Sequence, residues 1–165
     1  MEITNNDVLR RVRYTFELDD AEMIRVFGLA SQTVTRAEVS DWLKRDDDPA
    51  FAPLDDLGLA TFLNGFIIRQ RGRREGPQPK PESELTNNLI LVKLRIALNL
   101  QADDVLELIC TDDVDFSRHE LSALFRKPGH KHYRECLDQV LRNFLHDMQV
   151  RYRPGAAAAE DPSAT

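Results

Sequence analysis

The stretch Thr4-Asn5-Asn6-Asp7-Val8-Leu9 occurs a second time, in closely similar form, as Thr86-Asn87-Asn88-Leu89-Ile90-Leu91. From these two starting points the chain from Thr4 to Gln70 aligns without a gap with the chain from Thr86 to Tyr152. Apolar residues mostly align with apolar residues, and the identical pairs include Leu9/Leu91, Arg13/Arg95, Asp56/Asp138 and Phe62/Phe144. A register kept over a whole half-chain indicates an internal duplication.

Each copy has the pattern of four helices. In the first copy, apolar residues at helical spacing predict helices near residues 6–18, 20–29 and 55–70. A further helix begins after Thr35, which forms a capping box with Glu38, and Ser117 with Glu120 repeats this signal in the second copy. The sequence therefore predicts an all-α fold of two tandem four-helix units, about eight helices in total.

The composition between and after the copies changes to residues that cannot form a core. Residues 72–84 are rich in proline and glycine, which predicts a partly extended linker between repeats at 1–71 and 85–152. Residues 153–165 contain little that could be buried, and we expect a disordered tail there.

Charge and cysteine content narrow the class of protein. The 22 basic and 28 acidic residues give a net charge of −6, which argues against a broad nucleic-acid-binding surface but not against a local basic patch. Two cysteines are too few for a disulfide framework, and we find neither a secretory signal nor an apolar stretch long enough to span a membrane. We therefore expect a cytoplasmic protein without a membrane partner.

Several motifs resemble those of the YehS-like bacterial family, small proteins with a duplicated domain of unknown function. They are Trp42-Leu43-Lys44, Phe62-Leu63-Asn64-Gly65 with Ile67, Asn87-Asn88 leading to Leu94-Arg95-Ile96, and the block from His130 to Arg142. The resemblance covers nearly everything from Asn5 to Arg151. It implies the same duplicated fold and brings no activity with it.

The residues shared by both copies are the first candidates for a binding site. The pairs Asn5-Asn6 and Asn87-Asn88 could form a ligand-binding edge that occurs twice, or one asparagine of each pair could cap the following helix. If one asparagine of each pair is the cap, the role of its neighbour is left unexplained. Arg13 and Arg95 could bind an anion, or could cover the edge of the core and pair with an acidic group on the next helix.

The strongest divergence between the copies is the loop before the last helix of each. The second copy gathers basic residues around Pro128-Gly129, whereas the matching residues 45–51 of the first copy are strongly acidic. Its candidate binding residues are Lys127, His130, Lys131, Tyr133 and Arg134. The basic loop could contact a phosphate, a nucleic acid or an acidic partner. Alternatively, the two loops could face each other, or each could be a solvated helix junction.

The sequence contains no recognisable catalytic or metal-binding set. His132 and Cys136 would share a helix face if their segment were helical, but no third residue to orient such a pair is evident. We expect Cys136 to be partly buried and inert, Cys110 to lie in the core, and the protein to hold no metal or cofactor. Nucleotide-binding glycine motifs and hydrolase or zinc-protease signatures are also missing, so we do not expect an enzyme.

Three functions remain open from these observations. The first is a non-enzymatic regulatory module that binds a protein or peptide in a groove between the halves, as a monomer or homo-oligomer. The second is a nucleic-acid-associated regulator, because residues 23–38 resemble a helix-turn-helix and basic residues occur at 127–134 and at Arg69, Arg71, Arg73 and Arg74. The third is an unrecognised enzyme, which a deep pocket lined by Asn87, Arg95 and His130 would favour.

Overall fold

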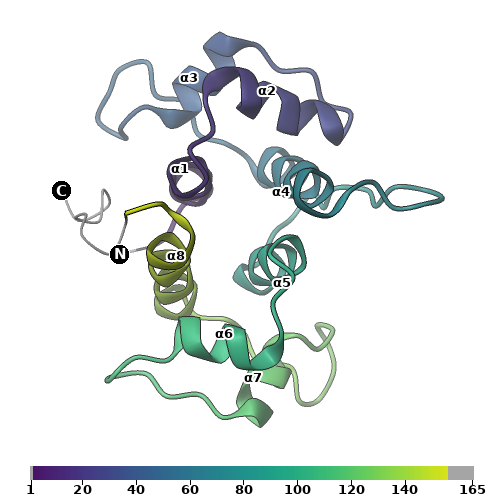
Figure 1. Cartoon of the computed structure of the whole chain (residues 1–165), viewed down its shortest axis with the longest axis vertical. Helices are drawn as coiled ribbons and strands as arrows, with labels where there is room; N and C mark the ends of the chain where they lie inside the picture. The colour runs from purple at the N-terminus through teal and green to yellow at the C-terminus, as the bar shows by residue number, and fades with distance from the viewer. Residues whose placement is uncertain (1, 156–165) are drawn as a thin grey trace.

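The structure is a computed structural model that describes residues 2–155 of the chain. These residues form eight helices and no strand, which confirms the predicted all-α fold with two similar halves (Figure 1). The helices are α1 (Asn5–Thr15), α2 (Asp20–Leu29), α3 (Arg36–Leu43), α4 (Asp56–Arg71), α5 (Asn87–Ala97), α6 (Ala102–Ile109), α7 (Arg118–Leu124) and α8 (Asp138–Tyr152). Within residues 2–155, no helix combines the length and apolar character needed to cross a membrane.

The two halves meet through four helices at the middle of the molecule. Figure 1 shows α1, α4, α5 and α8 grouped there, with α2 and α3 at one end and α6 and α7 at the other. Helix α4 packs against α5, and α1 packs against α8. Because α5 is the second copy of α1, and α8 the second copy of α4, these two contacts are the same contact made twice. The halves are therefore related by a pseudo-twofold axis.

The amino-terminal ends of the four central helices are held together by two carboxylates. Asp56 accepts hydrogen bonds from Asn5 Nδ2 at 2.8 Å and from the backbone N–H of Leu85 at 2.9 Å. In the matching arrangement, Asp138 accepts from Asn87 Nδ2 at 2.7 Å and from the Ile3 N–H at 3.2 Å. Each carboxylate thus joins the start of its own copy to the start of the other copy.

The four central helices consequently run parallel. Further along them, Phe16 at the end of α1 contacts both Phe66 on α4 and Tyr152 on α8, with ring centroids 5.1 and 5.7 Å apart. Parallel helices align their dipoles, so positive partial charge gathers at one end of the group and negative at the other. The side chains match this polarity: first turns carry Asp7, Asp56 and Asp138, and last turns carry Arg13, Arg71, Arg95 and Arg151.

The first half packs most tightly where α2 crosses α4. Phe27 and Phe62 are fully buried there, with ring centroids 5.2 Å apart. A Cβ at Gly65 would lie 1.9 Å from the Val26 carbonyl oxygen, so α2 can reach α4 only because residue 65 has no side chain. This close approach is specific to the first copy, because Asp147 occupies the matching position in the second.

Helix α1 ends at Thr15, three residues before the predicted end at Leu18. Glu17 has a positive φ of 53°, and the Leu18 N–H donates back to the Arg13 carbonyl at 3.0 Å. This is the Schellman motif, which usually has glycine at the left-handed position. The second copy repeats it with Asn99 at φ 55°. Because the sequence has no glycine there, it gives no clear signal for the end of the helix. The apolar pattern continues to Leu18, which is buried.

Candidate functional site

The helix caps in front of the paired asparagines are threonines. Thr4 accepts from the Asp7 N–H at 3.1 Å, and Thr86 accepts from the Leu89 N–H at 3.2 Å. The interpretation that one asparagine of each pair caps its helix is therefore wrong. Threonine is a weaker cap than asparagine by preference, but here the asparagine side chains are engaged elsewhere.

Asn6 and Asn88 hold the long loop of their own copy. Asn6 Nδ2 donates to the Trp42 and Ala52 carbonyls at 2.9 and 3.0 Å, and its Oδ1 accepts from the Leu54 N–H at 3.0 Å. Asn88 repeats all three bonds, with the Leu124 and Arg134 carbonyls and the Cys136 N–H. Together with the contacts of Asn5 and Asn87 to Asp56 and Asp138, these bonds engage all four amides inside the protein. The repeated asparagines are explained by the fold.

The basic loop and the acidic loop lie at opposite ends of the molecule. In Figure 1 the loop between α3 and α4 projects beside α3, whereas the loop between α7 and α8 lies below α5, near α7. The interpretation that the two loops face each other is therefore wrong. Within the basic loop, Lys127, His130 and Lys131 are exposed, and Tyr133 is half-buried.

Arg134, the last candidate of this loop, has partners within its own copy. Its guanidinium forms an ion pair with Glu120 at 3.0 Å and lies over the Phe116 ring at 5.0 Å. The backbone N–H of Ser117, and after it Arg134, hold the pKa of Glu120 below its ordinary value. Arg134 is therefore exposed but engaged within its own copy, and residues 127–132 form another exposed part of the loop.

The cysteine and histidine residues near this loop do not form a reactive pair. Residues 130–136 are not helical, so His132 and Cys136 share no helix face. Cys136 is 2% exposed, and burial raises the pKa of its thiol to about 12. Cys136 is therefore fully buried, whereas Cys110 is half-buried rather than a core residue. Residues 2–155 contain no group of three or more His, Cys, Asp or Glu side chains placed to hold a metal ion.

In the helix pair that resembles a helix-turn-helix, side chains at the start of the second helix form contacts within the protein. Glu38 and Glu120 complete the predicted capping boxes of α3 and α7. Arg36 lies 3.8 Å from Asp20, and Arg118 donates two hydrogen bonds to Asp103 at 2.5 and 2.7 Å. In each copy the first arginine of the second helix thus pairs with a carboxylate of the preceding helix, while its side chain stays mostly exposed.

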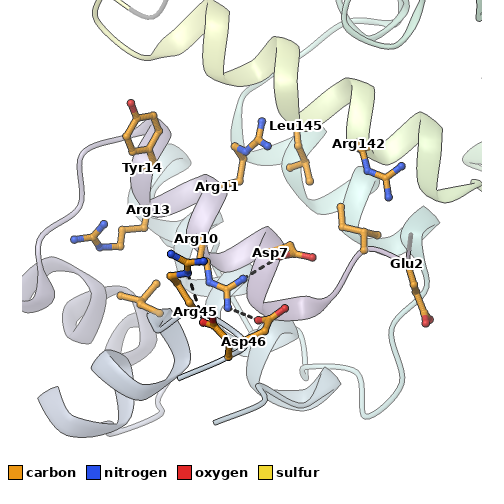
Figure 2. Close-up of a pocket in the computed structure, with 13 residues that line it drawn as sticks. Glu2, Asp7, Arg10, Arg11, Arg13, Tyr14, Arg45, Asp46, Arg142 and Leu145 are labelled. Atoms are coloured by element: carbon orange, nitrogen blue, oxygen red, sulfur yellow. Dashed lines mark hydrogen bonds and ion pairs between the residues drawn. The ribbon is translucent and has the colours of Figure 1, made fainter. Parts of the chain in front are cut away.

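Arg13 and Arg95 occupy equivalent positions but line two separate clefts. The first, which we call the α1–α8 cleft, has a volume of about 620 Å³ and lies between α1, the α3–α4 loop and α8 (Figure 2). Arg10 forms ion pairs there with Asp7 at 2.9 Å and with Asp46 at 2.7 Å. Arg11 and Arg13 point in different directions (Figure 2). With Glu2 and Asp47 also in the lining, acidic side chains largely balance the arginines.

The second cleft differs in its charge. This linker cleft, as we call it, has a volume of about 580 Å³ and lies between the ends of α2, α4 and α5 and the segment that joins the two copies. Its lining holds four arginines and no carboxylate, and its apolar side chains come from both halves. The lining residues are Leu29, Ala30, Ser31, Asn64, Ile67, Ile68, Arg71, Gly72, Arg73, Arg74, Gln78, Pro79, Pro81, Arg95, Ile96, Asn99 and Leu100.

Two of the four arginines are anchored and two are available. Arg95 donates from Nε to the Leu100 carbonyl at 3.2 Å and stacks on the Phe125 ring at 4.6 Å, while Arg73 donates to the Leu29 carbonyl at 3.0 Å. One interpretation paired Arg13 and Arg95 with an acidic group on the next helix. Among residues 2–155, neither arginine forms such an ion pair. Arg71 and Arg74 are exposed, and in the described part of the chain neither guanidinium has an acidic partner.

The equivalent place in the other half is arranged differently. Arg153 is the second copy of Arg71, and Tyr14 corresponds to Ile96. The Arg153 guanidinium lies over the Tyr14 ring at 3.7 Å and donates to the Tyr14 carbonyl. In the linker cleft, Ile96 is 48% exposed and Arg71 does not cover it. The two equivalent places therefore differ: Arg153 lies over Tyr14 in one, whereas Ile96 stays exposed in the other.

Comparison with known proteins places the chain in one family. The family model described as a protein of unknown function, DUF1456, matches residues 5–72 and again residues 87–154. The chain is 38% identical over 148 residues to the uncharacterized protein YehS of Escherichia coli strain K12, covering 89% of this chain and 95% of that protein. No solved structure matches. The chain therefore belongs to the DUF1456 family and carries its domain twice, once in each half.

Proposed function

We propose that this protein is a non-enzymatic regulatory module of the cytoplasm that binds an acidic segment of a partner protein in the linker cleft. The observation that carries this proposal is the charge of the lining, with four arginines and no carboxylate around an apolar floor. In a protein with a net charge of −6, such a concentration of uncompensated positive charge is a local feature. It favours an anionic ligand through charge complementarity.

The apolar floor defines the other half of the ligand. Ile67 and Ile68 come from α4 and Ile96 from α5, so both copies contribute to one surface. An exposed isoleucine beside arginines favours a segment in which apolar side chains alternate with acidic ones. The volume of about 580 Å³ is in the usual range of ligand clefts.

The lining favours a peptide over a nucleic acid. Single-stranded nucleic acids are bound largely by stacking of bases on aromatic rings, and the lining residues of the linker cleft include no aromatic side chain. The same lining favours binding over catalysis, because it includes no His, Cys, Asp or Glu to transfer protons.

A selection from a random peptide library displayed on phage tests the proposal. The selection would be run in parallel on the wild type, on the double variant Arg71→Glu/Arg74→Glu and on the control Lys127→Glu/Lys131→Glu. The control makes the same change of charge at exposed residues of the basic loop. We expect the wild type and the control to enrich peptides with acidic and apolar residues, and the cleft variant to lose them.

Enrichment that survives in the cleft variant, or is lost only in the basic-loop variant, would contradict this assignment. The same three proteins titrated with fluorescent single-stranded and duplex DNA at rising salt test the alternative of a nucleic-acid regulator. Salt-sensitive DNA binding lost with Lys127→Glu/Lys131→Glu would support that alternative over a peptide-binding cleft.

A further inference from the structure

Asn64 supplies a buried hydrogen-bond donor to the linker cleft. Its side chain is on α4, and the residue is 7% exposed. Oδ1 accepts from Lys93 Nζ at 2.6 Å, across the junction between the two halves. Nδ2 has no hydrogen-bond partner among residues 2–155, although the residue lines the cleft. A buried donor without a partner is unusual in a native protein.

Lys93 determines which end of the Asn64 amide is left without a hydrogen-bond partner. The two ends of an asparagine amide have the same shape, so its orientation follows from its hydrogen bonds. The Lys93 ammonium can only donate, and therefore it requires Oδ1 on its side. Lys93 itself is 8% exposed and lies 3.0 Å from the Glu82 carboxylate, which compensates its charge. This buried ion pair leaves Nδ2 as the end of the amide that has no hydrogen-bond partner among residues 2–155.

The donor is present in only one copy. The second copy has His146 in place of Asn64 and Arg11 in place of Lys93. Asn64 and Lys93 therefore occur together only at the contact between α4 and α5, beside the linker cleft. Asn64 also belongs to the motif Phe62-Leu63-Asn64-Gly65, whose phenylalanine, leucine and glycine are accounted for by packing.

We propose that Asn64 Nδ2 donates a hydrogen bond to a carbonyl or carboxylate oxygen of the acidic segment bound in the linker cleft. This inference rests on the proposed function and adds a requirement for an acceptor at one position of the ligand. Arg71 and Arg74 then contact its anionic groups at the mouth of the cleft, and Asn64 contacts it at the floor. The arginines contribute attraction, and the amide contributes selectivity for an oxygen.

Asn64→Asp is the sharpest test. The new carboxylate still accepts from Lys93, so the fold is maintained, but its second oxygen replaces the Nδ2 donor and repels an acceptor. We expect the affinity for the peptide selected on the wild type to fall at least tenfold, measured by fluorescence anisotropy. The matched control Asn143→Asp makes the same chemical change on α8, outside the cleft lining, and should leave affinity within twofold.

A second measurement on the wild type does not depend on the variant folding. The side-chain amide signal of Asn64 in a ¹H–¹⁵N spectrum, assigned by its loss in Asn64→Asp, should shift when the selected peptide saturates the protein. Unchanged affinity of Asn64→Asp, or an unshifted amide signal, overturns the role of Asn64 while Arg71→Glu/Arg74→Glu still tests the cleft. Failure of the wild type to select any peptide overturns both proposals.

Discussion

The carboxylate of Asp56 accepts the backbone N–H of Leu85 at 2.9 Å, and this bond crosses from the first copy of the domain to the second. Its counterpart, from the Ile3 N–H to Asp138, crosses in the opposite direction. The two bonds lie at the amino-terminal ends of parallel helices, where positive partial charge gathers and a carboxylate is favourable. They explain why an aspartate begins the last helix in both copies.

Replacement of Asp56 by alanine should lower the free energy of unfolding by about 2 kcal/mol, because two donors lose a charged acceptor. Asp138→Ala should have a similar effect. Urea denaturation followed by circular dichroism measures both. Glu84→Ala is the control, since Glu84 is exposed beside Leu85, and a loss as large as that of Asp56→Ala would contradict the specific role of Asp56.

Asn6→Asp and Asn88→Asp should each destabilise the protein by on the order of 3 kcal/mol at neutral pH. In each case a carboxylate oxygen replaces an amide that donates to two backbone carbonyls. Thermal unfolding measures the loss, and Gln70→Glu, which converts an exposed amide on α4 into a carboxylate, should change stability by less than about 0.5 kcal/mol. Near-normal stability of Asn6→Asp would mean that the amide does not hold the loop.

Gly28 and Gly65 should respond to alanine with opposite signs. Gly65→Ala forces α2 away from α4, because its Cβ would lie 1.9 Å from the Val26 oxygen, and should cost about 3 kcal/mol. Gly28→Ala on α2 meets no atom within 4 Å and should stabilise by about 0.5–1 kcal/mol. Urea denaturation of both variants measures this difference, and equal effects would refute the close helix approach.

Cys136 should make stability fall at alkaline pH. Burial raises the pKa of its thiol from 9.0 to about 12 in the folded protein, so between these values the unfolded chain loses the proton first. The contribution is present below pH 9 and declines by about 1.4 kcal/mol per pH unit above it. The free energies of unfolding of the wild type and Cys136→Ala should therefore converge from pH 9 to pH 11. If the two free energies keep a constant difference over this range, the prediction is wrong.

Local signals in the sequence were sufficient for the repeat, the helices and several of their caps. The capping boxes at Thr35 and Ser117 involve residues three apart, so their spacing can be read along the chain. The end of α1 was misplaced because Glu17 adopts a conformation that usually requires glycine. The role of the asparagines could not be predicted because their partners lie 36–51 residues away, beyond any local pattern.

The candidate site depended on tertiary structure for the same reason. The basic run that includes Arg71 and Arg74 was visible in the sequence, as was Arg95, but not the cleft that brings them beside Ile96. By itself the sequence determined that one domain occurs twice, because helix periodicity and caps are local properties. Only the packing of the halves decided how the two equivalent places differ, since that depends on Arg153 lying over Tyr14 in one and on Ile96 staying exposed in the other.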